Sequence, residues 1–171
     1  MELAQIFCRS CGRRKGGRVR TIVQMFKSLL RGGATGSAAS DVVGDALRTA
    51  DWIAKAMTSS GYGLDFSVKS LEEVDRFFEE QAPNGAPRPD GLLGKDLGAR
   101  LFAIGAYVGE VIRRQVGGEW KADDSDPEAE INISVRVNTG AVFWPVQRVM
   151  KRFKNGAEEG IYAYGVALIE H

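Results

Sequence analysis

Two cysteines near the N-terminus, Cys8 and Cys11, have the spacing most suggestive of chemistry, Cys-X-X-Cys. A zinc site within one chain needs four ligands, and the sequence offers no third cysteine and a single histidine, His171. Basic residues around the pair favour thiolates and therefore oxidation. Three interpretations stay open: no function, a redox pair, or a metal shared by two chains. We expect no cofactor in a single chain.

A second candidate is Glu110, which precedes Arg113 and Arg114 by three and four residues and follows Tyr107 closely. In a helix this spacing favours an internal ion pair over an acid or base with a perturbed pKa. Catalysis by a serine or cysteine with histidine is disfavoured, because His171 at the last position is a poor general base. If the chain binds a small ligand or is an enzyme, the site is expected to combine Tyr107, Glu110, Arg114, Trp120 and Trp144.

Charges also gather in two further segments. Asp123, Asp124, Asp126 and Glu128 lack the glycine and terminal glutamate of an EF-hand, so they predict a solvated acidic loop. A basic outer face is expected on a short C-terminal helix, formed by Arg148, Lys151, Arg152 and Lys154. One short helix without a reading motif favours nucleic-acid binding only weakly.

The Glu110 candidate depends on a helix predicted over residues 92–116, which carries Gly94, Gly98, Gly105 and Gly109 on one stripe. Each glycine costs about 1 kcal/mol relative to alanine. A phosphate loop needs its glycines after a strand with GxGxxG or GK[ST] spacing, which is missing here. The stripe therefore predicts that a neighbouring main chain packs closely against this helix. Apolar residues flank the stripe: Leu97, Leu101, Ile104, Val108, Val111 and Ile112.

Helical periodicity also predicts a helix at 41–58 with Ser40 as its N-cap, and a helix opened by a capping box of Ser70 and Glu73. Residues 131–137 alternate as a strand, a turn and a return strand follow, and Pro145 suits the first position of a short helix. The apolar face of that helix is formed by Val146, Val149, Met150 and Phe153. The stretch "GIYAYGVALI", residues 160–169, predicts a buried strand. The fold class is thus α+β, with N-terminal helices and a long glycine-striped central helix packed on a small C-terminal β-β-α-β antiparallel sheet.

Charge divides the chain unevenly. Residues 1–40 hold eight basic residues and one acid, whereas residues 41–171 hold fifteen basic and twenty-one acidic residues. We expect a basic extension over 1–36 and a single α+β domain over 37–171. The positive charge of the extension suits an anionic partner. Alternatively, the extension folds back on its own acidic domain.

The extension contains a predicted amphipathic helix at 18–31, which can lie on an anionic membrane, dock on a partner, or cap its own domain or a second copy. Its apolar arc holds Val19, Ile22, Val23, Met25, Phe26, Leu29 and Leu30. No apolar run approaches the roughly 18 residues that span a bilayer. The piece "LAQIF" is too short for a secretory signal, so we expect a cytoplasmic protein.

Three blocks of sequence, "LDFSVKSLEEVDRFFEE", "IGAYVGEVIRRQVGGEW" and "WPVQRVMKRFKNG", carry a resemblance. Over roughly residues 62–165 the chain resembles a family of small uncharacterised bacterial proteins, a domain of unknown function. The resemblance implies a bacterial cytoplasmic α+β protein and carries over no activity or catalytic residue.

These patterns predict a non-catalytic protein-interaction module whose N-terminal helix mediates contact, either with a protein partner or with a second copy of the chain in a dimer. The first alternative is a ligand binder or enzyme with a site near Glu110 and Trp120. The second is contact of the basic arm with an anionic membrane or nucleic acid, which would weaken steeply with salt.

Overall fold

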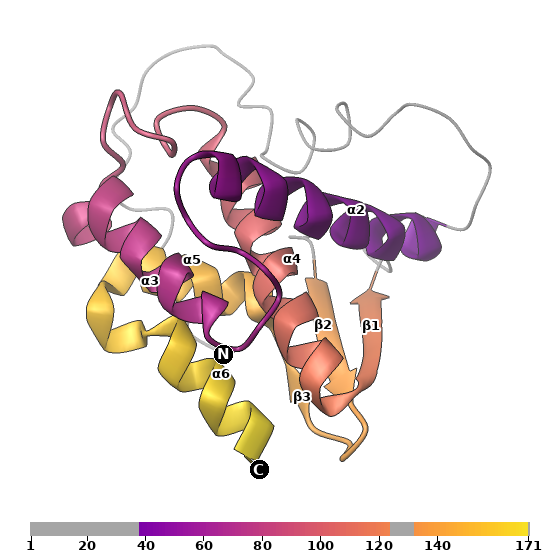
Figure 1. The fold of residues 1–171 in the computed structure, drawn as a ribbon. Helices are drawn as coiled ribbons and strands as arrows, with labels where there is room; N and C mark the ends of the chain where they lie inside the picture. The colour runs from indigo at the N-terminus through magenta and orange to yellow at the C-terminus, as the bar shows by residue number, and fades with distance from the viewer. Residues whose placement is uncertain (1–37, 124–131, 171) are drawn as a thin grey trace, which may run out of the picture.

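A computed structural model describes residues 38–123 and 132–170 of the chain (Figure 1). The fold class is α+β, as predicted. The helices are α2 (Ala38–Ser59), α3 (Ser70–Gln81), α4 (Leu97–Val116), α5 (Pro145–Asn155) and α6 (Ile161–Glu170). The strands are β1 (Gly118–Asp123), β2 (Asn132–Val137) and β3 (Val142–Phe143), and two short 3-10 helices cover Pro83–Gly85 and Ala157–Glu159.

Helix α4 forms the centre of the described fold, and both α2 and α5 pack against it. Every residue from Leu101 to Ile112 is buried, because apolar and small side chains occupy all sides of this stretch. The helix ends at Gly117, whose φ of 72° lies in the left-handed region that favours glycine. The prediction of a deeply buried central helix is confirmed.

Two of the four glycines in the predicted stripe allow close packing on α4. A Cβ on Gly105 would lie 2.6 Å from the Cα of Val146 at the start of α5. A Cβ on Gly109 would collide with the ring of Trp120 and lie 2.9 Å from Cγ of Pro145. Removing these side chains lets a main chain and an indole approach the helix axis.

Gly94 corrects the prediction, because it precedes α4 rather than belonging to it. The helix begins at Leu97 instead of residue 92, since Asp96 has a φ of 50° and so interrupts a right-handed helix. A Cβ on Gly94 would collide with the carbonyl oxygen of Pro89, so this glycine serves a tight turn. Gly98 is half-buried within the first turn.

The predicted capping box of α3 is wrong. Ser70 is the first helical residue, and its hydroxyl contacts the carbonyl of Ser67 and the hydroxyl of Tyr107. The amide of Ser70 donates to Oγ of Ser67 at 3.2 Å, and Glu73 accepts from the distant amide of Gly63 instead. Likewise α2 begins at Ala38, so Ser40 lies inside the helix and is not its cap.

The sheet is antiparallel with the order β1-β2-β3. In β2 the predicted alternation is confirmed, because Ile133, Val135 and Val137 are all buried. Strand β1 was not predicted: the sequence continues into an acidic segment, which favoured a loop. Trp120 of β1 pairs with Val135, and this register turns the indole toward α4.

Helix α5 begins at Pro145 as predicted, and Val146 and Val149 are buried. The predicted apolar face is wrong at Met150, which is 42% exposed. Arg152, predicted on the outer face, is only 4% exposed. The reason is a long-range partner for Arg152, Asp75 of α3.

The predicted C-terminal strand is wrong, since residues 161–170 form helix α6. Its apolar sequence suits a buried strand or a buried helix equally well. Asp75 of α3 favours the helix, because its carboxylate accepts hydrogen bonds from the amides of Ile161 and Tyr162, each at 2.9 Å. A carboxylate at these first amides stabilises a helix start.

Candidate functional site

The carboxylate of Glu110 lies at the centre of a buried cluster on α4. Oε1 accepts from Nε of Arg113 at 2.6 Å and from the indole Nε1 of Trp120 at 2.7 Å. Oε2 accepts from Nη2 of Arg113 at 3.0 Å and from Nε of Arg114 at 3.1 Å. The predicted internal ion pair is confirmed, with Glu110 only 1% exposed.

The sequence builds this cluster from two elements. Positions three and four residues after Glu110 share its face of α4, which brings both guanidinium groups to the carboxylate. Trp120 arrives from β1 after the turn at Gly117, and the missing side chain of Gly109 leaves room for its ring. The indole then donates to an acid that is 10 residues earlier.

This arrangement fixes the charge of Glu110. Burial alone would raise the pKa of the carboxyl, but hydrogen bonds from Arg113 and Trp120 and the charge of Arg113 outweigh burial and hold the pKa below its usual value. Four donors occupy the roughly four lone-pair positions of a carboxylate. Glu110 is therefore ionised at neutral pH and has no lone pair left to accept a substrate proton.

Tyr107 anchors a second set of contacts, one turn earlier on α4. Its hydroxyl lies 2.5 Å from Oγ of Ser70 and accepts the amide of Phe66 at 3.0 Å. Burial raises the pKa of Tyr107, so the phenol stays protonated. The hydroxyl ties α3 and the preceding loop to α4.

Arg114 joins the two sets. Its guanidinium lies 3.7 Å from the centre of the Phe66 ring, and this ring lies 4.8 Å from the ring of Tyr107. The guanidinium also lies 3.7 Å from Oδ1 of Asp51 on α2. Phe66 adopts a φ of 63°, a costly conformation for an aromatic residue, and its ring contacts Arg114 and Tyr107.

The structure thus brings Tyr107, Glu110, Arg114 and Trp120 into one connected network. Trp144 does not join it: the residue precedes α5 and is 44% exposed. None of these five residues lines the hollow between α2 and the loop that leads to α3, so their role as a ligand site stays a prediction.

An open hollow of about 360 Å³ lies between α2 and the loop that leads to α3. Its lining includes apolar residues, Ala54, Leu64 and Phe66, and polar residues, Asp51, Lys55, Thr58 and Ser59. Ala54 and Leu64 are buried, whereas the four polar residues are exposed. The hollow therefore has an apolar floor and a polar rim.

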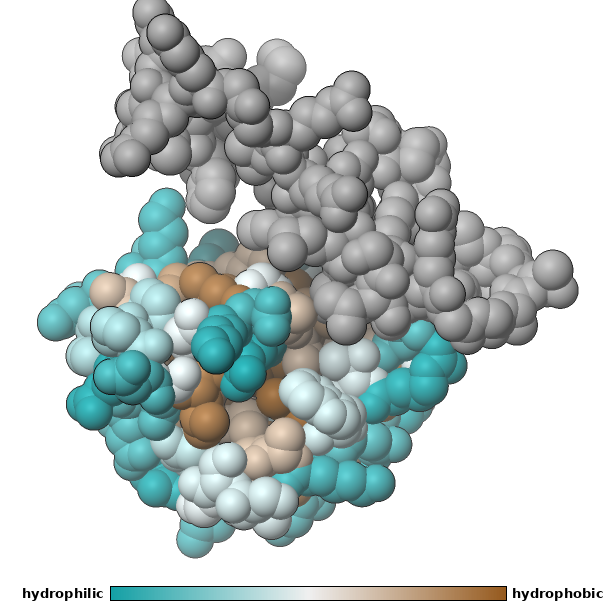
Figure 2. All heavy atoms as spheres, turned by 90° about the horizontal axis from the view of Figure 1, so that it is seen from above, coloured by the Kyte–Doolittle hydropathy of each residue, from teal (hydrophilic) through white to brown (hydrophobic). Residues whose placement is uncertain are grey.

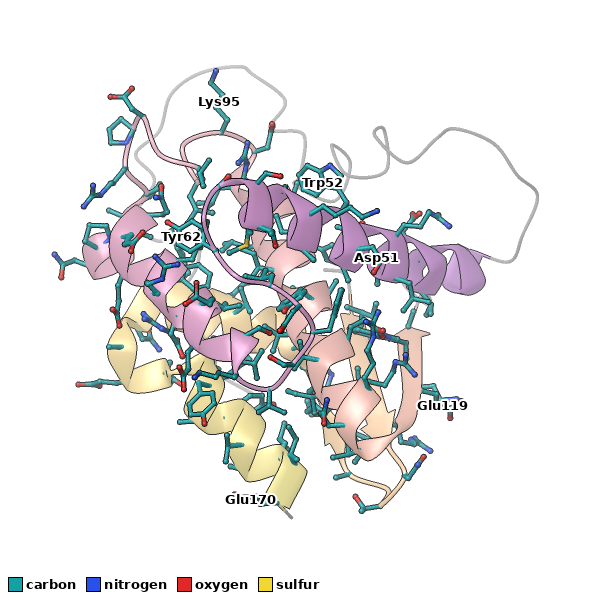
Figure 3. The ribbon with its side chains drawn as sticks, viewed as in Figure 1. Asp51, Trp52, Tyr62, Lys95, Glu119 and Glu170 are labelled. Atoms are coloured by element: carbon teal, nitrogen blue, oxygen red, sulfur yellow. The ribbon has the colours of Figure 1, made fainter. Side chains whose placement is uncertain are left out.

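Trp52 follows Asp51 on α2 but does not line the hollow. It is 56% exposed and projects outward from α2 (Figure 3). Sequence reasoning missed Trp52, because only the structure shows which side of α2 meets the core. The sequence did contain one indication, because Trp52 is a bulky aromatic residue outside the helical spacing of the apolar residues.

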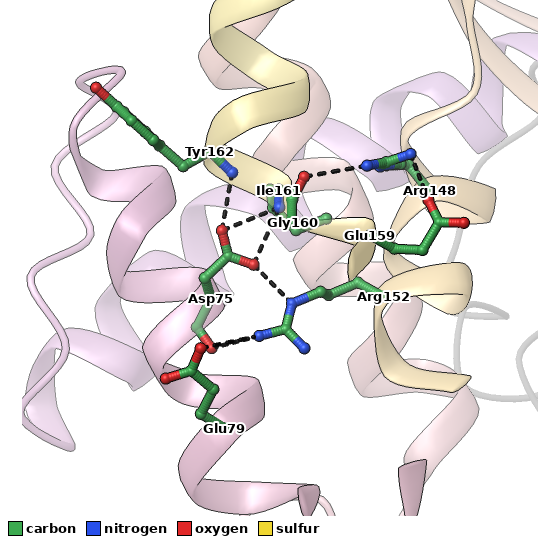
Figure 4. A network of polar contacts seen from close by, with 8 residues as sticks. All are labelled: Asp75, Glu79, Arg148, Arg152, Glu159, Gly160, Ile161 and Tyr162. Atoms are coloured by element: carbon green, nitrogen blue, oxygen red, sulfur yellow. Dashed lines mark hydrogen bonds and ion pairs between the residues drawn. The ribbon is translucent and has the colours of Figure 1, made fainter. Parts of the chain in front are cut away.

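The predicted basic face of α5 is partly wrong, because two of its four residues turn inward. Arg152 donates from Nε to Oδ1 of Asp75 at 2.7 Å and also contacts Glu79 (Figure 4). Arg148 donates to Glu159 at 2.6 Å and to the carbonyl of Gly160. Lys151 and Lys154 are exposed as predicted.

Several predicted elements lie outside the described residues. They are Cys8, Cys11, the helix at 18–31 and most of the acidic loop. Within 38–123 and 132–170, no group of three or more histidine, cysteine or acidic side chains is arranged to hold a metal ion. The helices in those ranges are all too short or too polar to cross a bilayer.

No protein-family model, curated protein or solved structure matches the chain. The resemblance over residues 62–165 therefore stays a prediction.

Proposed function

We propose that the protein is a non-catalytic protein-interaction module that binds a partner polypeptide at the α2 surface. We define this surface as Trp52 together with the hollow lined by Ala54, Thr58, Leu64 and Phe66. Two observations carry the proposal: Trp52 is 56% exposed on α2, and the same helix lines a hollow with an apolar floor. Exposed apolar surface that is rimmed by polar residues marks sites of protein interaction.

The chemistry of the α2 surface supports recognition of a polypeptide. Tryptophan is enriched among residues that dominate binding energy, and such residues are surrounded by polar rims that exclude water. Figure 2 views the molecule from the side on which α2 lies, and hydrophobic residues gather in the middle of that face with hydrophilic residues around them. An apolar side chain of a partner would fill the hollow while Trp52 packs against the partner's backbone.

The inward direction of the buried polar groups also supports a non-catalytic role. The hydroxyl of Tyr107 and the carboxylate of Glu110 form hydrogen bonds with neighbouring residues. Neither group lines the hollow. The charged groups that do line it, Asp51 and Lys55, are exposed to water. Charged groups at the edge of an apolar hollow form the polar rim that protein interfaces typically have.

The test uses the purified full chain as bait, with two variants of the α2 surface. Trp52→Ala removes the exposed ring, and Thr58→Trp fills the hollow. Met150→Ala is the control, since Met150 is 42% exposed on a different helix. Any captured polypeptide is then purified and its affinity for each form is measured by calorimetry.

We expect Trp52→Ala and Thr58→Trp each to weaken binding by roughly 30-fold or more, as a hot-spot residue does, with Met150→Ala unchanged. Equal affinity of all four proteins would contradict the proposal. So would a small molecule that stabilises the wild type and not Thr58→Trp when no polypeptide binds, because that outcome identifies a ligand site.

A further inference from the structure

Helix α6 is more apolar than its position in one chain requires. From Ile161 to Ile169 it carries no charged residue, and Glu170 is its only charge. A helix that is apolar on all sides is normally buried on all sides. Yet only Ile161 and Gly165 are buried in α6.

The uncovered side of α6 forms one continuous strip. Helical spacing places Tyr162, Ala163, Val166, Ala167 and Glu170 together, opposite the side that packs on the protein. Tyr162, Ala163, Ala167 and Glu170 are exposed, and Val166 is half-buried. Figure 4 shows the ring of Tyr162 directed away from the polar contacts at the start of the helix. We call these five residues the α6 strip.

The α6 strip belongs to a firmly held helix. Asp75 accepts the first two amides, and the guanidinium of Arg148 holds the carbonyl of Gly160 and lies 4.5 Å from the centre of the Tyr164 ring. The space for a side chain at Gly165 is filled by Leu71 of α3. The strip is therefore a fixed surface, which binds without the cost of ordering a loose segment.

We infer that the α6 strip is the contact surface between two copies of this chain, paired antiparallel about a two-fold axis at Val166. A two-fold axis at Val166 places Tyr162 of one copy opposite Glu170 of the other, so the two ends of the strip complement each other. The axis places Val166 against its equivalent, with Ala163 and Ala167 on both sides allowing close approach. At each end, the hydroxyl of Tyr162 then lies beside Glu170 of the other copy and donates to its carboxylate.

The area of the strip indicates how far the contact extends. A ten-residue helix is about 15 Å long, which is too short alone for the roughly 800 Å² that each partner buries in a standard interface. Beyond the strip, Arg148 of α5 lies over the ring of Tyr164, and Trp144 precedes Arg148 by one helical turn, so we expect the contact to extend to Trp144. Trp144 is 44% exposed and provides the second apolar anchor. The inference is independent of the α2 surface, because α2 and α6 contribute separate residues.

The test is sedimentation equilibrium of the full chain over a hundredfold concentration range. The wild type is expected to be a dimer that dissociates on dilution. Val166→Glu places two carboxylates opposite each other at the axis and is expected to weaken dimerisation by roughly 100-fold or more. Tyr162→Phe removes only the hydroxyl and is expected to weaken it by about 3- to 10-fold. Gln115→Glu, an equal charge change at an exposed position of α4, is expected to leave the dimer intact.

Amide hydrogen exchange of the wild type gives a second measurement that needs no variant. Dilution is expected to speed exchange in α6 while β2, which lies in the core, stays unchanged. A monomer at every concentration, or a Val166→Glu dimer of unchanged affinity, would overturn the inference. Either result leaves the α2 surface untouched, since its test measures affinity for a different polypeptide.

Discussion

Two buried ionic groups in this protein each neutralise a charged side chain, but their partners lie at very different distances along the sequence. Around Glu110, both arginines come from the next turn of the same helix. Around Arg152, the carboxylate of Asp75 comes from a helix 77 residues away. Both groups neutralise a charge that burial would otherwise make costly. The comparison shows that the Glu110 group joins α4 to the strand that follows it. The Arg152 group instead positions α5 and α6 against α3.

The largest expected effect breaks the local group. Glu110→Ala leaves two guanidinium groups and a buried indole N–H without their acceptor, so we expect a loss of about 3–5 kcal/mol in the free energy of unfolding. Urea denaturation followed by circular dichroism measures it. Glu119→Ala is the control, because Glu119 is exposed on β1. A loss below about 1 kcal/mol would show that the cluster is not structural.

The next effect breaks the distant group. Asp75→Ala removes the partner of Arg152 and the acceptor of the first α6 amides, and we expect a loss of about 2–3 kcal/mol. The loss is smaller than for Glu110 because Glu79 still contacts Arg152. Hydrogen exchange is expected to show α6 losing protection before α4. Uniform loss across both helices would contradict a separate role for Asp75.

A smaller effect sharpens the comparison by disturbing the local group without touching a charge. Gly109→Ala forces the Trp120 ring outward, so the indole leaves Glu110, and we expect a loss of about 1–3 kcal/mol. Gly98→Ala is the matched control on the same helix, at a half-buried position. Trp120 fluorescence is expected to shift to the red in Gly109→Ala. An unchanged spectrum would contradict the close fit at Gly109.

The smallest expected effect is on pH dependence. The folded state holds the pKa of Glu110 below its ordinary 4.5, so ionised Glu110 stabilises the fold fully at neutral pH. This contribution is lost as pH falls from 4.5 through the lower folded-state pKa. The stability difference between wild type and Glu110→Gln should therefore narrow in that range. A difference that stays constant from pH 7 to pH 3 would contradict the direction of the shift.

The same comparison explains how much the sequence predicts. The ion pair of Glu110, the packing role of Gly105 and Gly109, and the alternation of β2 follow from local spacing, and each is confirmed. Helix α6 was predicted as a strand because its helical start depends on Asp75, which no local pattern connects to Ile161.

The candidate surface shows the same limit. Four members of the predicted site, including Glu110, lie in one network because they share α4 or follow it closely. The exposure of Trp52 depends on which side of α2 meets the core, and the hollow depends on the backbone of Phe66 in the left-handed region. Both are set by tertiary packing, so short-range periodicity does not reveal them.

The most direct test of the account compares the partner affinity of folded Glu110→Gln with that of folded Trp52→Ala. We predict that Glu110→Gln is less stable than the wild type yet binds with unchanged affinity per folded molecule. We predict that Trp52→Ala keeps its stability and loses roughly 30-fold in affinity. The opposite pattern, with binding lost at Glu110 and retained at Trp52, would contradict the account.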